Sequence, residues 1–338
     1  MQAPTYPATS YSVGIICALE VELTAVQATL DEKHGSVAKA AGDSNKYAFG
    51  KIGMHNVVVA CLPAGEPGTV QATGVAKDML DSFPIKVGLM VGICGGVWSK
   101  KADVRLGDVI VSQPDGMHGG VVQWDHGKWE KYGVFKRKGM LSKPPLPLLS
   151  AMQSLKAKYR LEGSGISYHL EQMLTKYSLL NDQGFGYQGR EDDVLFEASY
   201  VHAGGDDCSK CDGTKVVKCR PPRQDLRPMV HYGNIASGDS VVKDGPTRDR
   251  IAQEEGILAF EMEAAGLMDR FPCVVIRGVC DYADSHKNDR WQPYAAATAA
   301  CYCKELLGVV DPHEIAQQEV AQQEIARHEK AEVKQASK

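Results

Sequence analysis

Residues 87–93 have the sequence Val87-Gly88-Leu89-Met90-Val91-Gly92-Ile93, which is apolar on both faces of the strand that it predicts. Strands buried on both faces are typical of parallel sheets covered by helices. Similar runs occur at 11–17, 57–61, 108–112, 230–236 and 273–279. Helical patterns lie between and after them, at 19–30, 69–80 and 293–307. The alternation predicts a three-layer α/β fold, in which helices cover both faces of a mixed, mostly parallel, twisted sheet.

The composition of the 338 residues argues against several classes of protein. Hydrophobic residues make up 43%, which is enough for a sizeable core, and the net charge of −4 does not suggest a nucleic-acid partner. No apolar run is long enough to span a membrane. The first residues have neither a basic start nor an apolar run, so we expect no secretory signal and a cytoplasmic protein. The ten cysteines are then expected to be reduced, because several lie in or beside apolar strands: Cys17, Cys61, Cys94, Cys273 and Cys280.

The α/β pattern predicts one domain over residues 11–310, with two departures. Residues 180–228 are rich in Gly, Asp, Arg and Pro and are interpreted as an insertion or lid. Residues 311–338 contain a five-residue repeat, Ile-Ala-Gln-Gln-Glu and near copies. A period of five does not match the 3.6 residues of a helical turn, so its apolar positions form no continuous stripe. We expect a polar helical or disordered tail, with a partner-binding segment as the alternative.

Two segments at predicted strand ends contain candidate site residues in the first third of the chain. Glu20 and Glu22 follow the first strand, and they would point about 200° apart on a helix, so at most one faces a site. Both would also suit the positive end of a helix dipole. Cys94, Gly95 and Gly96 follow the strand at 87–93, where glycines let a ligand approach the backbone. An ordinary glycine turn is equally compatible with them.

Two further segments lie in the last third of the chain. Glu261, Met262 and Glu263 begin a helix-like segment; the carboxylates could accept hydrogen bonds from a ribose diol, and Met could pack on the sugar. The alternative is that the acids only favour a helix N-terminus. Asp281 directly follows a buried strand, a suitable place for a general acid, or else it caps a helix.

In this order, the four segments resemble the nucleoside phosphorylase and nucleosidase superfamily. The runs 231–239, 247–249 and 277–288 are similar to its fungal purine nucleosidase-like branch, which is related to methylthioadenosine nucleosidase, and the resemblance covers residues 11–310. It implies that Glu22 activates the attacking water and that Asp281 protonates N7 of the purine. It implies that Glu263 binds the ribose hydroxyls and that Met262 packs on the sugar. The remaining substrate-binding positions that we expect are Glu261, Cys94, Gly95, Gly96 and Val241.

The chain departs from the family pattern at two of these positions. Many members have Ser where this chain has Cys94, and nucleosidases often have a base-stacking Phe where it has Val241. Packing against the base therefore needs another aromatic side chain. The insertion offers three candidates, Phe185, Tyr187 and Phe196.

The residues after the first strand favour hydrolysis over phosphorolysis. Phosphorylases of this superfamily typically have a Gly-Asp-Pro turn with an Arg there, whereas this chain has Cys17-Ala18-Leu19-Glu20-Val21-Glu22. A carboxylate at that place would repel phosphate and could accept a proton from water. We therefore expect a purine nucleosidase, preferring adenine compounds because Asp281 can accept from a 6-amino group. The alternatives are a phosphate-dependent phosphorylase and a nucleotide-sensing or ATP nucleosidase module of an immune-type receptor. The resemblance implies no cofactor. It implies that the protein is a homodimer and that it binds a small purine nucleoside or nucleotide.

The insertion carries two further groups of interest. The spacing of His202, Cys208, Cys211 and Cys219 is compatible with zinc, but a second close ligand pair is missing, so no metal is assigned and a free-thiol lid is equally compatible. The basic residues are Lys215, Lys218, Arg220, Arg223 and Arg227. They would either bind a 5′-phosphate as part of a lid or offset the nearby acids at 191–193 in a solvated loop.

Overall fold

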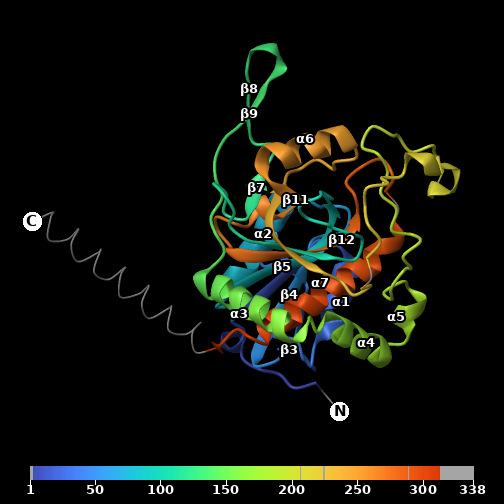
Figure 1. Ribbon diagram of the computed structural model, residues 1–338. Coiled ribbons are helices and arrows are strands. Elements are labelled where there is room, and N and C mark those ends of the chain that lie inside the picture. Colours follow the sequence, from blue (N-terminus) through green and yellow to red (C-terminus); the bar gives the residue numbers. More distant parts are fainter. Residues whose placement is uncertain (1–2, 206, 224, 288, 313–338) are drawn as a thin grey trace, which may run out of the picture.

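The computed structural model describes residues 3–312 except 206, 224 and 288, and a mixed ten-stranded sheet forms its centre (Figure 1). The main path of the sheet has the order β11-β10-β6-β12-β5-β1-β4-β3-β2, and β7 pairs with β10. Six of these strands are the predicted ones, namely β1 (Val13–Cys17), β4 (His55–Cys61), β5 (Val87–Gly96), β6 (Val109–Ser112), β10 (Val230–Ser237) and β12 (Cys273–Asp281). The others are β2 (Glu32–His34), β3 (Tyr47–Ile52), β7 (Val121–Gln123) and β11 (Ile257–Glu261). A separate hairpin of β8 (Gly127–Trp129) and β9 (Phe135–Arg137) projects from the body.

Strand β5 lies at the centre of the sheet and is parallel to both neighbours, β1 and β12. β1 is also parallel to β4, and β10 is parallel to β6 and β11, whereas β12 and β6 are antiparallel. The sheet is thus mixed and mostly parallel, which confirms the predicted fold class. Because β1, β5 and β12 run in the same direction, their carboxyl ends meet at one edge, where α/β sheets bind ligands.

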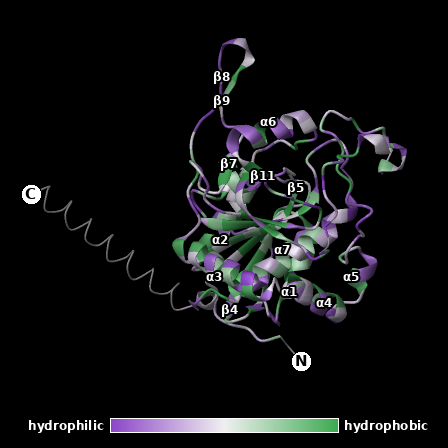
Figure 2. Ribbon diagram, viewed as in Figure 1, coloured by the Kyte–Doolittle hydropathy of each residue, from purple (hydrophilic) through white to green (hydrophobic). Residues whose placement is uncertain are grey.

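Helices cover both faces of the sheet. On one face lie α1 (Glu20–Thr29), α3 (Leu146–Glu162), α4 (Ile166–Lys176) and α7 (Gln292–Leu307), whose buried side chains share one core. On the other face lies α2 (Thr69–Ser82), and α6 (Gly245–Glu255) packs near β10 and β11. The short α5 (Leu179–Asp182) forms the start of the insertion. Figure 2 shows the apolar strands between the more polar outer faces of these helices.

Helix α7 packs closely on β12 because small residues meet at the contact. Five of its alanines are almost completely buried: Ala295, Ala296, Ala297, Ala299 and Ala300. A Cβ atom at Gly278 of β12 would lie only 1.8 Å from the carbonyl oxygen of Ala295. Any side chain at residue 278 would therefore push the helix away from the strand that ends in Asp281.

The segment from Phe260 to Gly266 is not a helix, because Glu261 ends β11 and only one 3₁₀ turn, Ala264–Gly266, follows Glu263. The ten cysteines are free thiols. None of the helices in the described ranges has the length and apolar character needed to cross a membrane. The predicted tail at 311–338 lies outside the described residues from 313 onward.

Candidate active site

A cavity of about 260 Å³ opens at the carboxyl ends of β1, β5, β11 and β12. Its volume is near the lower end of the range for small-molecule sites. Eight of the nine residues that we expected at the site line it, namely Glu22, Cys94, Gly95, Val241, Glu261, Met262, Glu263 and Asp281. The ninth, Gly96, is not among the lining residues; a Cβ there would meet Val279 and Val104, so its Cα faces the core.

Glu22 is buried in the first turn of α1, whereas Glu20 is exposed, as their spacing implies. Its Oε2 accepts from the backbone N–H groups of Ala18 and Leu19 at 2.6 and 2.9 Å, and its Oε1 accepts from Ile93 at 2.8 Å. Burial raises the pKa of Glu22, although Arg277 and the three backbone donors act in the opposite direction. A raised pKa makes this carboxylate a better proton acceptor than an ordinary glutamate.

Arg277, in the middle of β12, is the residue on which the acidic side chains converge. It is 1% exposed, and its guanidinium lies 3.7 Å from Glu22 Oε1 and 3.0 Å from Glu263 Oε2 and also pairs with Glu261. We had assigned Arg277 no role, yet an Arg inside an otherwise apolar strand was a usable signal, since a buried charge needs partners. Gly92 on β5 makes room for this contact, because a Cβ there would lie 2.4 Å from both Arg277 Nη1 and Glu22 Oε1.

Glu261 and Glu263 have different roles although they are two residues apart. Glu261 accepts from the N–H groups of Glu263 and Ala264 and holds Arg277, so it orders the turn that follows β11. The Glu263 carboxylate pairs with Arg277, and burial raises the pKa of this carboxyl to about 7. Met262 lines the cavity beside Glu263. Among the described residues that line the cavity, the one aromatic side chain is that of Phe260.

Asp281 ends β12 and does not cap a helix. A β-bulge between Val279 and Asp281 shifts the register with β5, so that Asp281 lies opposite Gly95. Its Oδ1 accepts from the N–H of Ala283 at 2.7 Å, and its Oδ2 accepts from Lys287 Nζ at 2.8 Å. Gly95 permits this approach, because a Cβ there would lie 2.7 Å from Asp281 Oδ1. Lys287 stands in the run of residues that carried the resemblance, but the sequence alone gave it no function.

The insertion does not supply an aromatic wall, which corrects that expectation. Phe185 is buried in the core formed with α4 and α7. Tyr187 packs edge-on against Trp291 and Tyr294, and Phe196 stacks on His286 at 4.2 Å between ring centroids. None of the three lines the cavity. The insertion instead packs against the segment that follows β12. Asp193 accepts a hydrogen bond from the Tyr282 hydroxyl, and Arg220 lies over the Tyr282 ring.

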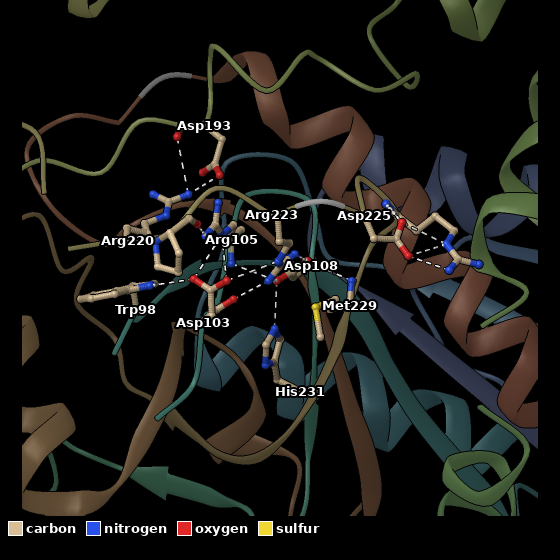
Figure 3. Close-up of polar contacts among 12 residues, drawn as sticks. Trp98, Asp103, Arg105, Asp108, Asp193, Arg220, Arg223, Asp225, Met229 and His231 are labelled. Carbon is tan, nitrogen blue, oxygen red and sulfur yellow. Dashed lines mark hydrogen bonds and ion pairs between the residues drawn. The ribbon is translucent and has the colours of Figure 1, made fainter. Parts of the chain in front are cut away.

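The arginines of the insertion are also committed elsewhere, as Figure 3 shows. Arg223 forms a two-pronged pair with the buried Asp108, with both N–O distances 2.7 Å, and Arg220 pairs with Asp193. Asp108 also accepts from His231 and from the N–H of Met229 at 2.9 Å. Although burial would raise it, the hydrogen bonds from Arg223 and His231 hold the pKa of Asp108 below its ordinary value. The pairs anchor the insertion to β6 and β10, so the predicted phosphate-binding role has no support here.

Comparison with known proteins adds to this geometry. Residues 12–146 match the model of the phosphorylase superfamily. The chain is 44% identical to a nucleotide-binding leucine-rich repeat (NLR)-like protein of Hyaloscypha variabilis over 93% of its own length, but it spans only 31% of that relative. It is 24% identical to 5′-methylthioadenosine/S-adenosylhomocysteine nucleosidase of Mycobacterium bovis, covering 88% of this chain and 95% of the relative.

A solved structure has the same fold. It is the nucleosidase of the same name from Neisseria meningitidis in complex with methylthio-immucillin-A, with a TM-score of 0.55 and 17% identity, covering 88% of this chain and 98% of the other. The three-layer fold, the position of the cavity at the strand ends and the matched residues agree with one another. The chain is therefore similar to the phosphorylase superfamily over residues 12–146, and it shares the fold of the solved nucleosidase.

Proposed function

We propose that the cavity binds a purine nucleoside and hydrolyses its N-glycosidic bond, releasing the free base and ribose. The observation that carries this proposal is the meeting of Glu22, Glu263 and Asp281 at one cavity, from three segments far apart in the sequence. The named activity of the similar nucleosidases supports the same reaction class. The roles of single residues follow from their chemistry.

Cleavage of the bond between C1′ and N9 leaves positive charge on the sugar and negative charge on the purine. The reaction has the needs of glycoside hydrolysis, an acid at the leaving group and a base at the water. Glu22 takes a proton from the water as it attacks C1′, because its pKa is raised by burial and its Oε1 has only one backbone donor. Asp281 delivers a proton to N7 of the departing base, and Lys287, hydrogen-bonded to Asp281, can replace that proton. Glu263 holds the ribose hydroxyls so that these groups are aligned.

The cations of the cavity favour water over phosphate as the second substrate. Phosphorolysis needs basic side chains free to bind an anion. Among the lining residues that the structure describes, the basic ones are Arg277 and Lys287. Arg277 is paired with three carboxylates, and Lys287 is paired with Asp281. A phosphate ion placed here would meet Glu22 and Glu263 without an uncommitted positive partner.

A second candidate is a nucleotide-processing or nucleotide-sensing module of a longer receptor. The observation that favours it is the NLR-like relative, which this chain resembles strongly over only 31% of the relative's length. The cavity mouth is compatible with a larger ligand, because Leu19 and Val241 line it and are 38% and 51% exposed. The same exposed apolar residues support the expected homodimer, in which a second subunit would cover the mouth. Preference for adenine remains part of the proposal through Asp281.

One experiment tests both candidates. The purified chain is incubated with adenosine, guanosine, inosine, 5′-methylthioadenosine, AMP and ATP, each with and without inorganic phosphate, and products are separated by chromatography. We expect the free base and a sugar that is not phosphorylated at carbon 1, released at equal rates in both buffers. Ribose 1-phosphate formed only with phosphate would overturn the hydrolase proposal. Exclusive release of adenine from ATP would favour the second candidate, and binding without any released base would overturn enzymatic function.

A further inference from the structure

A second group of reactive side chains lies in the insertion, outside the cavity. One ligand atom from each of His202, Cys208 and Cys211 lies within 4.8 Å of the other two, and all three residues are half-buried. A 3₁₀ turn, Cys208–Lys210, gives this arrangement: the N–H of Cys211 donates to the carbonyl of Cys208 at 3.0 Å. Asp207 caps the turn by accepting from the N–H of Ser209 at 3.0 Å. The two thiols therefore lie side by side as free cysteines.

We propose that His202, Cys208 and Cys211 bind a structural zinc ion. Zn²⁺ prefers thiolate sulfur and imidazole nitrogen in sets of four, and the two cysteines are separated by two residues, as in many structural sites. The site is separate from the cavity and from the proposed hydrolysis, so either can hold without the other. The sequence spacing showed no second ligand close to the cysteine pair, but folding brings His202 next to it. Cys219 is exposed and is not part of the cluster.

The hydrogen bonds of His202 favour metal binding through one nitrogen. Its Nε2 lies 3.0 Å from the carbonyl oxygen of Asp207, which can only accept, so Nε2 carries the proton. Metal-binding histidines usually donate their other ring N–H to such a carbonyl, which fixes the orientation of the ring. Nδ1 then carries the lone pair, which accepts from the N–H of Gly204 at 3.1 Å, and a zinc ion would replace this hydrogen bond.

His286 is suited to be the fourth ligand. Its ring centroid lies 5.5 Å from that of His202, and both of its ring nitrogens are buried and have no hydrogen-bond partner among the described residues. Nδ1 is 3.3 Å from Asp284 Oδ1, which is a charge contact without hydrogen-bond geometry. A small movement of the ring within its stack on Phe196 would complete a tetrahedral set.

Such a site would fasten the insertion to the segment that follows Asp281. His202 already donates its backbone N–H to Ser285 Oγ at 3.0 Å, and His286 is one residue from Lys287, which holds Asp281. Zinc bound between the two segments would limit the movement of residues 282–287. Its role is thus positional, and it takes no part in bond cleavage.

The test uses the full chain, purified without chelators from cells grown with zinc. Metal analysis by plasma mass spectrometry should find about one zinc per chain, and Cys208→Ser and Cys211→Ser should lower this to near zero. Cys219→Ser is the matched control, a thiol of the same insertion outside the cluster, and should keep its zinc. Because the first two variants could fail to fold, chelation of the wild-type chain is the second measurement: it should release the zinc, expose two additional reactive thiols and lower the Tm.

Cobalt gives an independent spectroscopic readout. Co²⁺ added to the metal-free chain should produce a thiolate charge-transfer band that saturates at one equivalent and is absent in Cys208→Ser. His286→Asn should weaken zinc binding at least about tenfold; unchanged binding would remove His286 from the ligand set. A wild-type chain that contains no zinc and gives no thiolate band with Co²⁺ would overturn the site. Equal loss of zinc in Cys219→Ser and Cys208→Ser would also overturn the assignment of ligands.

Discussion

Arg277 Nη2 lies 3.0 Å from Glu263 Oε2, and both side chains are almost completely buried. The same guanidinium also pairs with Glu22 and Glu261, so one positive charge is shared by three acidic groups. Burial of this excess of acid raises the pKa of both Glu22 and Glu263. The site residues proposed as base and as ribose ligand are therefore tuned by one residue that need not touch the substrate.

Replacing Arg277 should destabilise the protein strongly. Arg277→Met keeps a long side chain but leaves three buried acids without a counter-charge, and removing one partner of a buried pair typically costs about 3–5 kcal/mol. We expect a loss of this size in the free energy of unfolding, measured with urea near neutral pH. Arg277→Lys is the control, because it keeps the charge and should lose less. If both variants unfold at the wild-type midpoint, Arg277 does not neutralise the acids.

Asp281→Asn should remove most of the turnover and leave the fold intact. Asn can still accept from the N–H of Ala283, but it cannot deliver a proton to the leaving base. A positioned general acid typically contributes about 10²–10⁴ in rate, so kcat should fall within that range. Lys287→Met, which removes the residue that holds Asp281, should lower kcat less. Full activity of Asp281→Asn, with an unchanged circular dichroism spectrum, would exclude Asp281 as the acid.

Glu263→Gln should mainly impair recognition of the ribose. Glutamine can accept one hydrogen bond from a diol but not two through equivalent oxygens. We therefore expect kcat/KM for a riboside to fall more than kcat/KM for the matching 2′-deoxyriboside, both measured by release of base. Val241→Ala, at the cavity mouth, is a suitable comparison, since it should not alter the ratio between the two sugars. An equal loss for both sugars in Glu263→Gln would show that the carboxyl does not contact the 2′-hydroxyl.

Glu263 should also make stability depend on pH. Burial raises its pKa from 4.5 to about 7, so the folded protein favours the neutral acid. This contribution to stability is fully present below the ordinary pKa of 4.5 and is lost as the pH rises through about 7. We expect the free energy of unfolding of the wild type, relative to Glu263→Gln, to fall by about 3 kcal/mol over this window. Parallel curves for the two proteins across the window would contradict the raised pKa.

The sequence allowed prediction of the central strands, because parallel strands buried on both faces are continuous apolar runs. Such a pattern is missing in β2 (Glu32–His34), which becomes a strand only by pairing with β3. Glu22, Glu263 and Asp281 were candidates because each lies in a short local motif, and the resemblance to the superfamily implied their roles. The role of Arg277 could not, since its three partners come from separate segments that only the folded chain brings together. The insertion was harder still, because the same arginines that suggest a phosphate site form ion pairs with acids on distant strands.

The last prediction concerns those arginines. Arg223 keeps only 14% of its side chain exposed and forms a two-pronged pair with Asp108, whose side chain is 2% exposed. Removal of Arg223 leaves the Asp108 carboxylate with His231 as its side-chain partner among the described residues. Arg223→Ala should therefore lower the free energy of unfolding by about 2–3 kcal/mol, somewhat less than the loss of a fully buried pair. Arg227→Ala is the matched control in the same insertion. Arg227 pairs with Asp225, both side chains are more than half exposed, and loss of this pair should leave the urea midpoint unchanged. If the arginines serve as anchors, the ratio of activity on nucleotides to activity on nucleosides should be the same in the wild type and both variants. A selective loss of nucleotide turnover in Arg223→Ala, with wild-type stability, would instead restore the phosphate-binding role, because the arginine would then act on the substrate and not on Asp108.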